Sequence, residues 1–290
     1  MAPPNRLLDR NIRFSDKRNP DDFLGGLVQN GSVTETNFLS MLNIVLVASS
    51  PIRVYAKATG APVLQTDTPL QLGDYIVACD DQIHVSNEPW LHRVISHSVS
   101  GREDGFRDGI RARDRKCVIS GVVNTRSAGN WTSFEAAHIF PLELENLWIE
   151  FNYGRWVDDI DDDAGISKIN SCQNGFLLQS TVHKAFDQYL LSVNPDDNYK
   201  ITVFDIDIFG FDGRVLDPAC LNPEDPHRVS DHLLRWHFRQ SVLANMRRAG
   251  EPIFEHDFPP GTDMMKEIRE GPYAQERFEK ELAARFKGVV

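Results

Sequence analysis

The sequence predicts an α+β protein with three parts: a β-rich N-terminal unit, a central core and a C-terminal amphipathic helix. Alternating apolar and polar residues between positions 51 and 90 predict the first part. A strand, then a turn with a short apolar strand, then a helix follow one another between residues 134 and 191 and predict the second part. Apolar residues at helical spacing after residue 230 predict the third part.

Residues 1–35 are polar and contain several prolines and glycines, so we expect a flexible lead-in. The β-rich unit covers residues 36–100. It starts with "TNFLSMLNIVLVASS", which is compatible with either a helix or a buried strand. The stretch "IRVYAKATG" predicts a strand that ends in a turn, and "GDYIVACDDQIHVS" predicts a hairpin folded at Asp80-Asp81.

The predicted core covers residues 101–215. A helix at 102–116 leads into "CVISG", a short strand and turn, and then into "FEAAHIFPL", a strand that Pro141 terminates. Residues 142–170 have little regular pattern beyond "ENLWIEF". "NGFLLQ" predicts a turn and a strand, "STVHKAFDQYLL" a helix capped by Ser180 or Thr181, and "YKITVFDIDIFGFDG" a further strand. Residues 216–290 form the C-terminal helical region, whose main helix is "DHLLRWHFRQSVLANMRRAG", ended by Gly250.

Composition excludes several classes of protein. The longest apolar run, "FLSMLNIVLVA", is too short to span a bilayer, and the N-terminus has no apolar signal core, so we expect an intracellular protein, cytoplasmic or nuclear, with no membrane partner. The four cysteines are widely spaced, which favours reduced thiols over a disulfide frame or a zinc cage. No phosphate-binding loop, dinucleotide fingerprint or nucleophile elbow is found in the sequence.

Charge is distributed unevenly along the chain. The net charge of −11 argues against a broad electrostatic grip on nucleic acid. Residues 101–125 nevertheless carry six Lys and Arg side chains against four acids. The candidates for contacts with a phosphate backbone are Arg111, Arg113, Arg115 and Lys116. The ordinary alternative is a solvated helix surface.

Four polar residues of the core have the chemistry of a phosphodiester-cleaving site. His138 ends the predicted strand, where a neutral imidazole can act as a general base. His183 and Asp187 lie four residues apart on a predicted helix, so they share one face and can share a divalent ion. Asn174, beside Gly175, can pin the loop that carries His138. On spacing alone, a structural histidine, an exposed helical pair and a simple turn are the more common readings.

The order "AAHIFP", "NGFLL", "VHKAFD" resembles the HNH nuclease family and its ββα-metal motif, most of all the branch common in predicted fungal proteins. The resemblance covers about residues 110–205. It implies that His138 is the general base, Asn174 the middle asparagine and His183 a metal ligand, with Asp187 at the position of a further ligand. Many members have Asp or His directly before the base, and this chain has Ala137 there. Glu135 is a candidate substitute ligand.

The resemblance therefore implies a metal-dependent endonuclease that acts on DNA in preference to RNA. The divalent ion would be Mg²⁺ or Mn²⁺, with Zn²⁺ as a further option. The alternative is a catalytically degenerate HNH fold that serves as an interaction or regulatory module, which the acidic total and Ala137 favour. Recruitment of the fold to small-molecule chemistry is a third, weaker option. Plasmid nicking with Mg²⁺ or Mn²⁺ against EDTA discriminates among the three.

Overall fold

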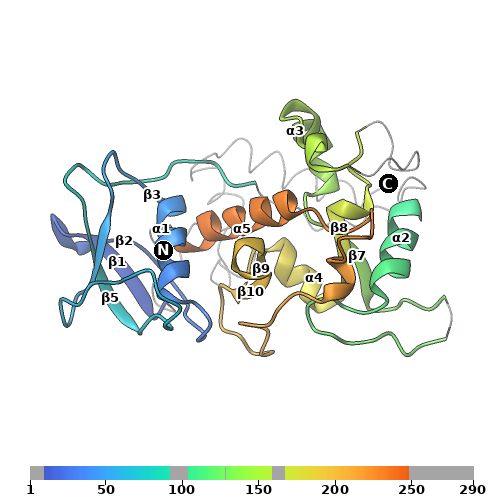
Figure 1. Cartoon of the computed structure of the whole chain (residues 1–290), viewed down its shortest axis with the longest axis horizontal. Helices are drawn as coiled ribbons and strands as arrows, with labels where there is room; N and C mark the ends of the chain where they lie inside the picture. The colour runs from blue at the N-terminus through green and yellow to red at the C-terminus, as the bar shows by residue number, and fades with distance from the viewer. Residues whose placement is uncertain (1–9, 92–103, 128, 159–166, 248–290) are drawn as a thin grey trace, which may run out of the picture.

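The computed structural model describes residues 10–91, 104–127, 129–158 and 167–247 (Figure 1). A four-stranded sheet with helix α1 lies at one end of the molecule, and the β7–β8 strand pair with helix α2 lies at the other. Helix α5 runs between the two ends. Mixed helices and strands confirm the predicted α+β class.

The N-terminal sheet begins earlier than the sequence indicated. Strands β1 (Ile12–Asp16) and β2 (Asn19–Leu27) lie in the segment expected to be a flexible lead-in, and residues 1–9 lie outside the described residues. The sheet order is β2-β1-β5-β4, with β4 at Arg53–Ala56 and β5 at Gly73–Ala78. Ile12 and Phe14 of β1 are fully buried, and this burial explains why a polar-looking segment is ordered.

Helix α1 (Glu35–Val45) resolves the open choice between helix and buried strand. Thr34 and Asn37 form a capping box at its start, and strand β3 (Leu46–Val47) follows at its end. The predicted hairpin at Asp80-Asp81 is wrong. Strand β5 pairs with β1 and β4, while β6 (His84–Val85) pairs with β3. The chain therefore turns at the two aspartates without pairing the flanking strands, because both edges of β5 are already occupied.

The core contains the ββα succession that the sequence predicted. Strands β7 (Phe134–His138) and β8 (Gly175–Gln179) are antiparallel, and helix α4 (Ser180–Asp187) follows β8 directly. Helix α2 (Asp104–Asp114) precedes them, and residues 117–121 form a turn without the short strand expected there. The remaining elements are α3 (Glu145–Glu150), β9 (Leu191–Asn194), β10 (Lys200–Val203) and the 3₁₀ turns η3 (Leu142–Leu144), η4 (Tyr153–Trp156), η6 (Cys172–Asn174), η7 (Pro195–Asp197) and η8 (Pro218–Cys220).

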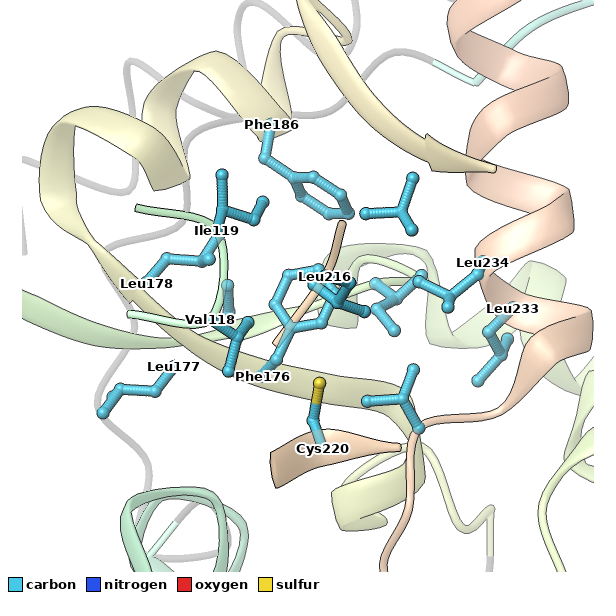
Figure 2. Packing of buried hydrophobic residues seen from close by; sticks show 14 of the residues in the cluster. Val118, Ile119, Phe176, Leu177, Leu178, Phe186, Leu216, Cys220, Leu233 and Leu234 are labelled. Carbon is cyan, nitrogen blue, oxygen red and sulfur yellow. The ribbon is translucent and has the colours of Figure 1, made fainter. Parts of the chain in front are cut away.

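Helix α5 (Asp231–Met246) joins the two hydrophobic cores. Leu233, Leu234 and Trp236 pack in the core around β8 and α4, whereas Phe238 and Val242 pack in the core of the N-terminal sheet. Figure 2 shows Leu233 and Leu234 reaching from α5 toward the packed side chains of β8 and α4. The helix ends at Met246, before Gly250, which lies outside the described residues. Within the part of the chain that the structure describes, every helix is too short or too polar to cross a bilayer.

Candidate functional site

Strand β7 presents alternate residues to two helices. Glu135 contacts His183 of α4, and Ala137 pairs with Phe176, whose ring packs edge-on against Phe186 of α4 at 5.0 Å between centroids (Figure 2). His138 instead stacks on Phe106 of α2. Side chains alternate between the two faces of a strand, so α4 covers one face of the β7–β8 pair and α2 the other.

Phe106, Asn170 and Gly175 are neighbours of His138 at the end of β7. Its ring lies parallel to that of Phe106, with 3.9 Å between centroids and 11° between planes. Its Nε2 lies 3.0 Å from Oδ1 of Asn170. Gly175 is its partner across the strand pair, and a Cβ there would lie 2.4 Å from the Phe106 ring. His138 as a whole is half-buried, and these contacts orient its ring.

Asn174 is fully buried and ties the end of β7 to the preceding loop. Its Oδ1 accepts from the backbone N–H of Phe140 at 2.8 Å, and its Nδ2 donates to the carbonyls of Phe140 and Ile169 at 3.1 and 2.9 Å. Its own carbonyl accepts from Ile139 N at 2.8 Å. All these contacts are with protein backbone, which makes Asn174 a fixing point for the residues that follow His138.

The structure brings together three predicted site residues on the α4 face. Nδ1 of His183 lies 2.6 Å from Glu135 Oε2, and Nε2 lies 3.2 Å from Asp187 Oδ2. Ser180, expected as a helix cap, instead donates its hydroxyl to Glu135 Oε1 at 2.7 Å. Glu135 is half exposed, while Asp187 and His183 are largely buried. The imidazole therefore lies between an exposed and a buried carboxylate.

These contacts change the protonation of the cluster. Burial disfavours a charged His183 ring, but the hydrogen bonds to Asp187 and Glu135 outweigh burial and raise its pKa from 6.5 to about 9. The hydrogen bond from His183 also lowers the pKa of Glu135. At neutral pH the cluster is an imidazolium between two carboxylates.

The donor chemistry of this cluster suits a divalent ion, although its arrangement is not that of a closed metal site. Among the described residues, no three His, Cys, Asp or Glu side chains are placed so that they could hold a metal ion. An imidazole nitrogen and a carboxylate oxygen are nevertheless suitable donors for Mn²⁺, Mg²⁺ or Zn²⁺. Metal-binding histidines commonly donate their second ring nitrogen to a carboxylate, as His183 can to Asp187. An ion would have to displace the proton between His183 and Glu135.

His138 and the His183 cluster have different neighbours. Glu135 and His138 are three residues apart, which is about 10 Å along a strand, and their side chains leave β7 on opposite faces. Ala137, at the position where many HNH nucleases have a ligand, is fully buried on the α4 face. The structure thus brings Glu135, His183 and Asp187 into contact with one another. Asn174 instead hydrogen-bonds to the backbone of Phe140, two residues after His138.

The four predicted nucleic-acid contacts differ in their surroundings. Arg111 pairs with Asp108 at 3.5 Å, its guanidinium lies 5.1 Å from the centre of the Trp131 ring, and burial lowers its pKa. Lys116 pairs with Asp217 at 2.6 Å. Arg115 is exposed and bonds only to a backbone carbonyl within the described residues. Arg115 is therefore the one of the four best placed to contact a partner.

Arg113 is engaged inside the protein, which does not favour the expected contact with nucleic acid. Its side chain is 3% exposed, and its guanidinium donates to the carboxylate of Asp114 and to the carbonyls of Cys172, Gly175 and His227. Asp114 in turn accepts from the backbone N–H of Leu177 at 2.7 Å. All five guanidinium hydrogens are aimed at protein acceptors, which lie at the end of α2, around the start of β8 and before α5, and none is left for a phosphate.

Sequence reasoning missed the residues that position His138 and the turn at Asn174-Gly175. Asp114 is an acid in a run of basic residues, a pattern that is compatible with an exposed ion pair as well as a buried one. Asn170 lies in a segment with no regular pattern, and Phe106 reads as an ordinary apolar position of helix α2. The Asn-Gly pair at 174–175 was the only available signal, and it points to a turn and not to the residues that contact it.

Comparison with known families found two matches. The family described as HNH endonuclease matches residues 117–194, and a domain of unknown function (DUF8573) matches residues 9–84. The first match confirms the family resemblance and includes His138, Asn174, His183 and Asp187. Comparison with curated proteins and with solved structures found no significant match.

Proposed function

Residues 117–194 are an HNH endonuclease domain, and we propose from that premise that this protein hydrolyses phosphodiester bonds, with DNA favoured over RNA. A nuclease-type activity on nucleic acid follows from the family. The finer proposal is that His138 is the general base and that a divalent ion binds beside His183. The observation that carries it is the order of β7, β8 and α4, which has the predicted base at the end of β7 and the imidazole–carboxylate cluster between β7 and α4.

In the proposed reaction, His138 takes a proton from water as the water oxygen bonds to phosphorus. The bond to the 3′ oxygen breaks, leaving a 5′-phosphate and, after protonation by solvent, a 3′-hydroxyl. Asn174 supports this step by fixing the backbone directly after the base. Phe106 and Asn170 support it by restraining the imidazole.

His183 and Glu135 would hold the ion, and Asp187 would orient the imidazole from its second nitrogen. When bound, a divalent ion supplies positive charge for the phosphoryl and leaving oxygens. Glu135 contacts Nδ1 of His183, whereas Asp187 contacts Nε2 on the other side of the ring. The ligand role predicted for Asp187 therefore remains a prediction. Arg115 is the favoured contact to the substrate backbone, with Arg111 beside Trp131 as the second.

Plasmid nicking tests this proposal. Parent protein should convert supercoiled plasmid to open circles with Mg²⁺ or Mn²⁺ and not with EDTA. His138→Ala should lower the rate by about a hundredfold or more, because a positioned general base contributes that much. His84→Ala is the matched control, since His84 is exposed on β6 in the N-terminal unit. Equal rates for the parent and a folded His138→Ala variant would remove His138 from the reaction.

A second candidate function has specific observations in its favour. Ala137 is buried where a ligand would be expected, and His183 is protonated between two carboxylates at neutral pH. Two of the predicted cationic contacts, Arg113 and Lys116, are engaged within the protein. A degenerate HNH domain that binds a partner without cutting would have these features. Plasmid that remains intact at every metal concentration and pH, with a protein that is folded, would favour this alternative.

A further inference from the structure

The contact between His138 and Asn170 determines which ring nitrogen of the proposed base carries a hydrogen. This inference rests on the proposed function. Asn170 lies in the loop before β8, thirty-two residues after His138 in the chain. Its Oδ1 lies 3.0 Å from Nε2 of His138. A carbonyl oxygen accepts and cannot donate, so the hydrogen of a neutral imidazole must lie on Nε2 when this bond forms.

The placement of Asn170 is built into the fold. Asn174 donates from one amide group to the carbonyl of Ile169, next to Asn170, and to the carbonyl of Phe140, two residues after His138. One buried side chain thus fixes both backbones that carry the interacting pair. Ile169 is itself 1% exposed and packs in the core, which anchors the loop further.

The ring of His138 is also fixed in plane. The parallel stack on Phe106 prevents rotation about the side chain without loss of the ring contact. Gly175 allows Phe106 to approach, because any larger residue would clash with its ring at 2.4 Å. The stack sets the plane of the imidazole, and Asn170 decides which of its nitrogens points toward the loop.

We propose that Asn170 is a positioning residue that fixes His138 in the Nε2–H tautomer, with the lone pair on Nδ1. In the hydrolytic step Nδ1 is then the nitrogen that takes the proton of the attacking water. Nε2 keeps its hydrogen bond to Asn170 in both the neutral and the protonated ring. This arrangement follows the general logic of a base oriented by a third group.

The first test is spectroscopic and needs no activity. Long-range ¹H–¹⁵N correlation spectra, recorded on the full chain above the pKa of His138 and assigned by comparison with His138→Gln, report which ring nitrogen carries the hydrogen. The parent should show a single Nε2–H tautomer for His138. Asn170→Ala should show a mixture of tautomers, with a population change of about fivefold expected from the loss of one neutral hydrogen bond. Asn222→Ala, in an exposed loop before α5, is the matched control and should match the parent.

The second test uses Asn170→Asp, which keeps the shape of the side chain. A carboxylate at 3.0 Å favours the charged imidazolium, so the pKa of His138 should rise by about one pH unit or more. The acid limb of the kcat/KM profile should move to higher pH by the same amount. Asn222→Asp should leave both unchanged.

An Nδ1–H tautomer in the parent, or unchanged His138 signals in both folded Asn170 variants, would overturn the inference. A parent that has the Nε2–H tautomer but cuts no nucleic acid supports the positioning and contradicts the proposed function. The two proposals therefore fail in different experiments.

Discussion

The pKa of His183 predicts a stability that depends on pH in a specific direction. The folded state raises this pKa from 6.5 to about 9, so the folded protein binds a proton that the unfolded chain releases first. The contribution is fully present below about pH 6.5 and is lost as pH rises through 9. At about 1.4 kcal/mol for each pH unit between the two values, the loss is about 3 kcal/mol.

The measurement is the free energy of unfolding by urea, in EDTA, at intervals from pH 6 to pH 10. His183→Gln is the control variant, because it keeps a polar side chain and cannot titrate. The free energy of the parent should fall relative to the variant by about 3 kcal/mol over this range, since the difference between them removes the titration of all other groups. Glu135→Gln should reduce the fall, because it removes the negative charge of one of the two carboxylates that raise the pKa. Parallel profiles for the parent and His183→Gln would refute the reasoning and show that the imidazolium is not stabilised by its carboxylate neighbours.

Three further predictions concern the His183 cluster, the buried Arg113 and the turn at Gly175. Asp187→Asn should shift the metal midpoint for nicking strongly with Mg²⁺ and less with Mn²⁺, which accepts nitrogen donors more readily; an unchanged midpoint would remove Asp187 from the site. Arg113→Ala should destabilise the protein by about 3–5 kcal/mol in urea denaturation because it leaves Asp114 buried without its partner, whereas Arg115→Ala should change stability by less than about 0.5 kcal/mol. Equal effects of the two substitutions would contradict the assignment of a buried anchor. Gly175→Ala should cost about 1–3 kcal/mol in the same assay, because a Cβ there would lie 2.6 Å from the carbonyl oxygen of Ala137; a neutral effect would show that the turn can relax.

Part of the fold was predictable because it depends on local patterns. Helix α2, strands β7 and β8 and helix α4 each have a periodicity or a turn that a short window of sequence contains. The lead-in was not predictable in the same way, since β1 is ordered by pairing with β5, about sixty residues away, and β2 by pairing with β1. The false hairpin at Asp80-Asp81 has the same origin: alternation identifies a strand and not its partner.

The sequence by itself determined the chemistry that is available to this protein. The order of His138, Asn174, His183 and Asp187 indicates the HNH family because residue type and spacing along the chain are sufficient to define the motif. The tertiary structure alone decided which side chains contact the motif residues and which cations are buried. It joined Glu135 to His183, placed Asn170 against His138, and buried Arg113 against Asp114 and three carbonyls. Apart from the pair of neighbours Arg113 and Asp114, these contacts join segments that are thirty to more than a hundred residues apart. They follow from how helices pack on the two faces of a strand pair and not from any local pattern.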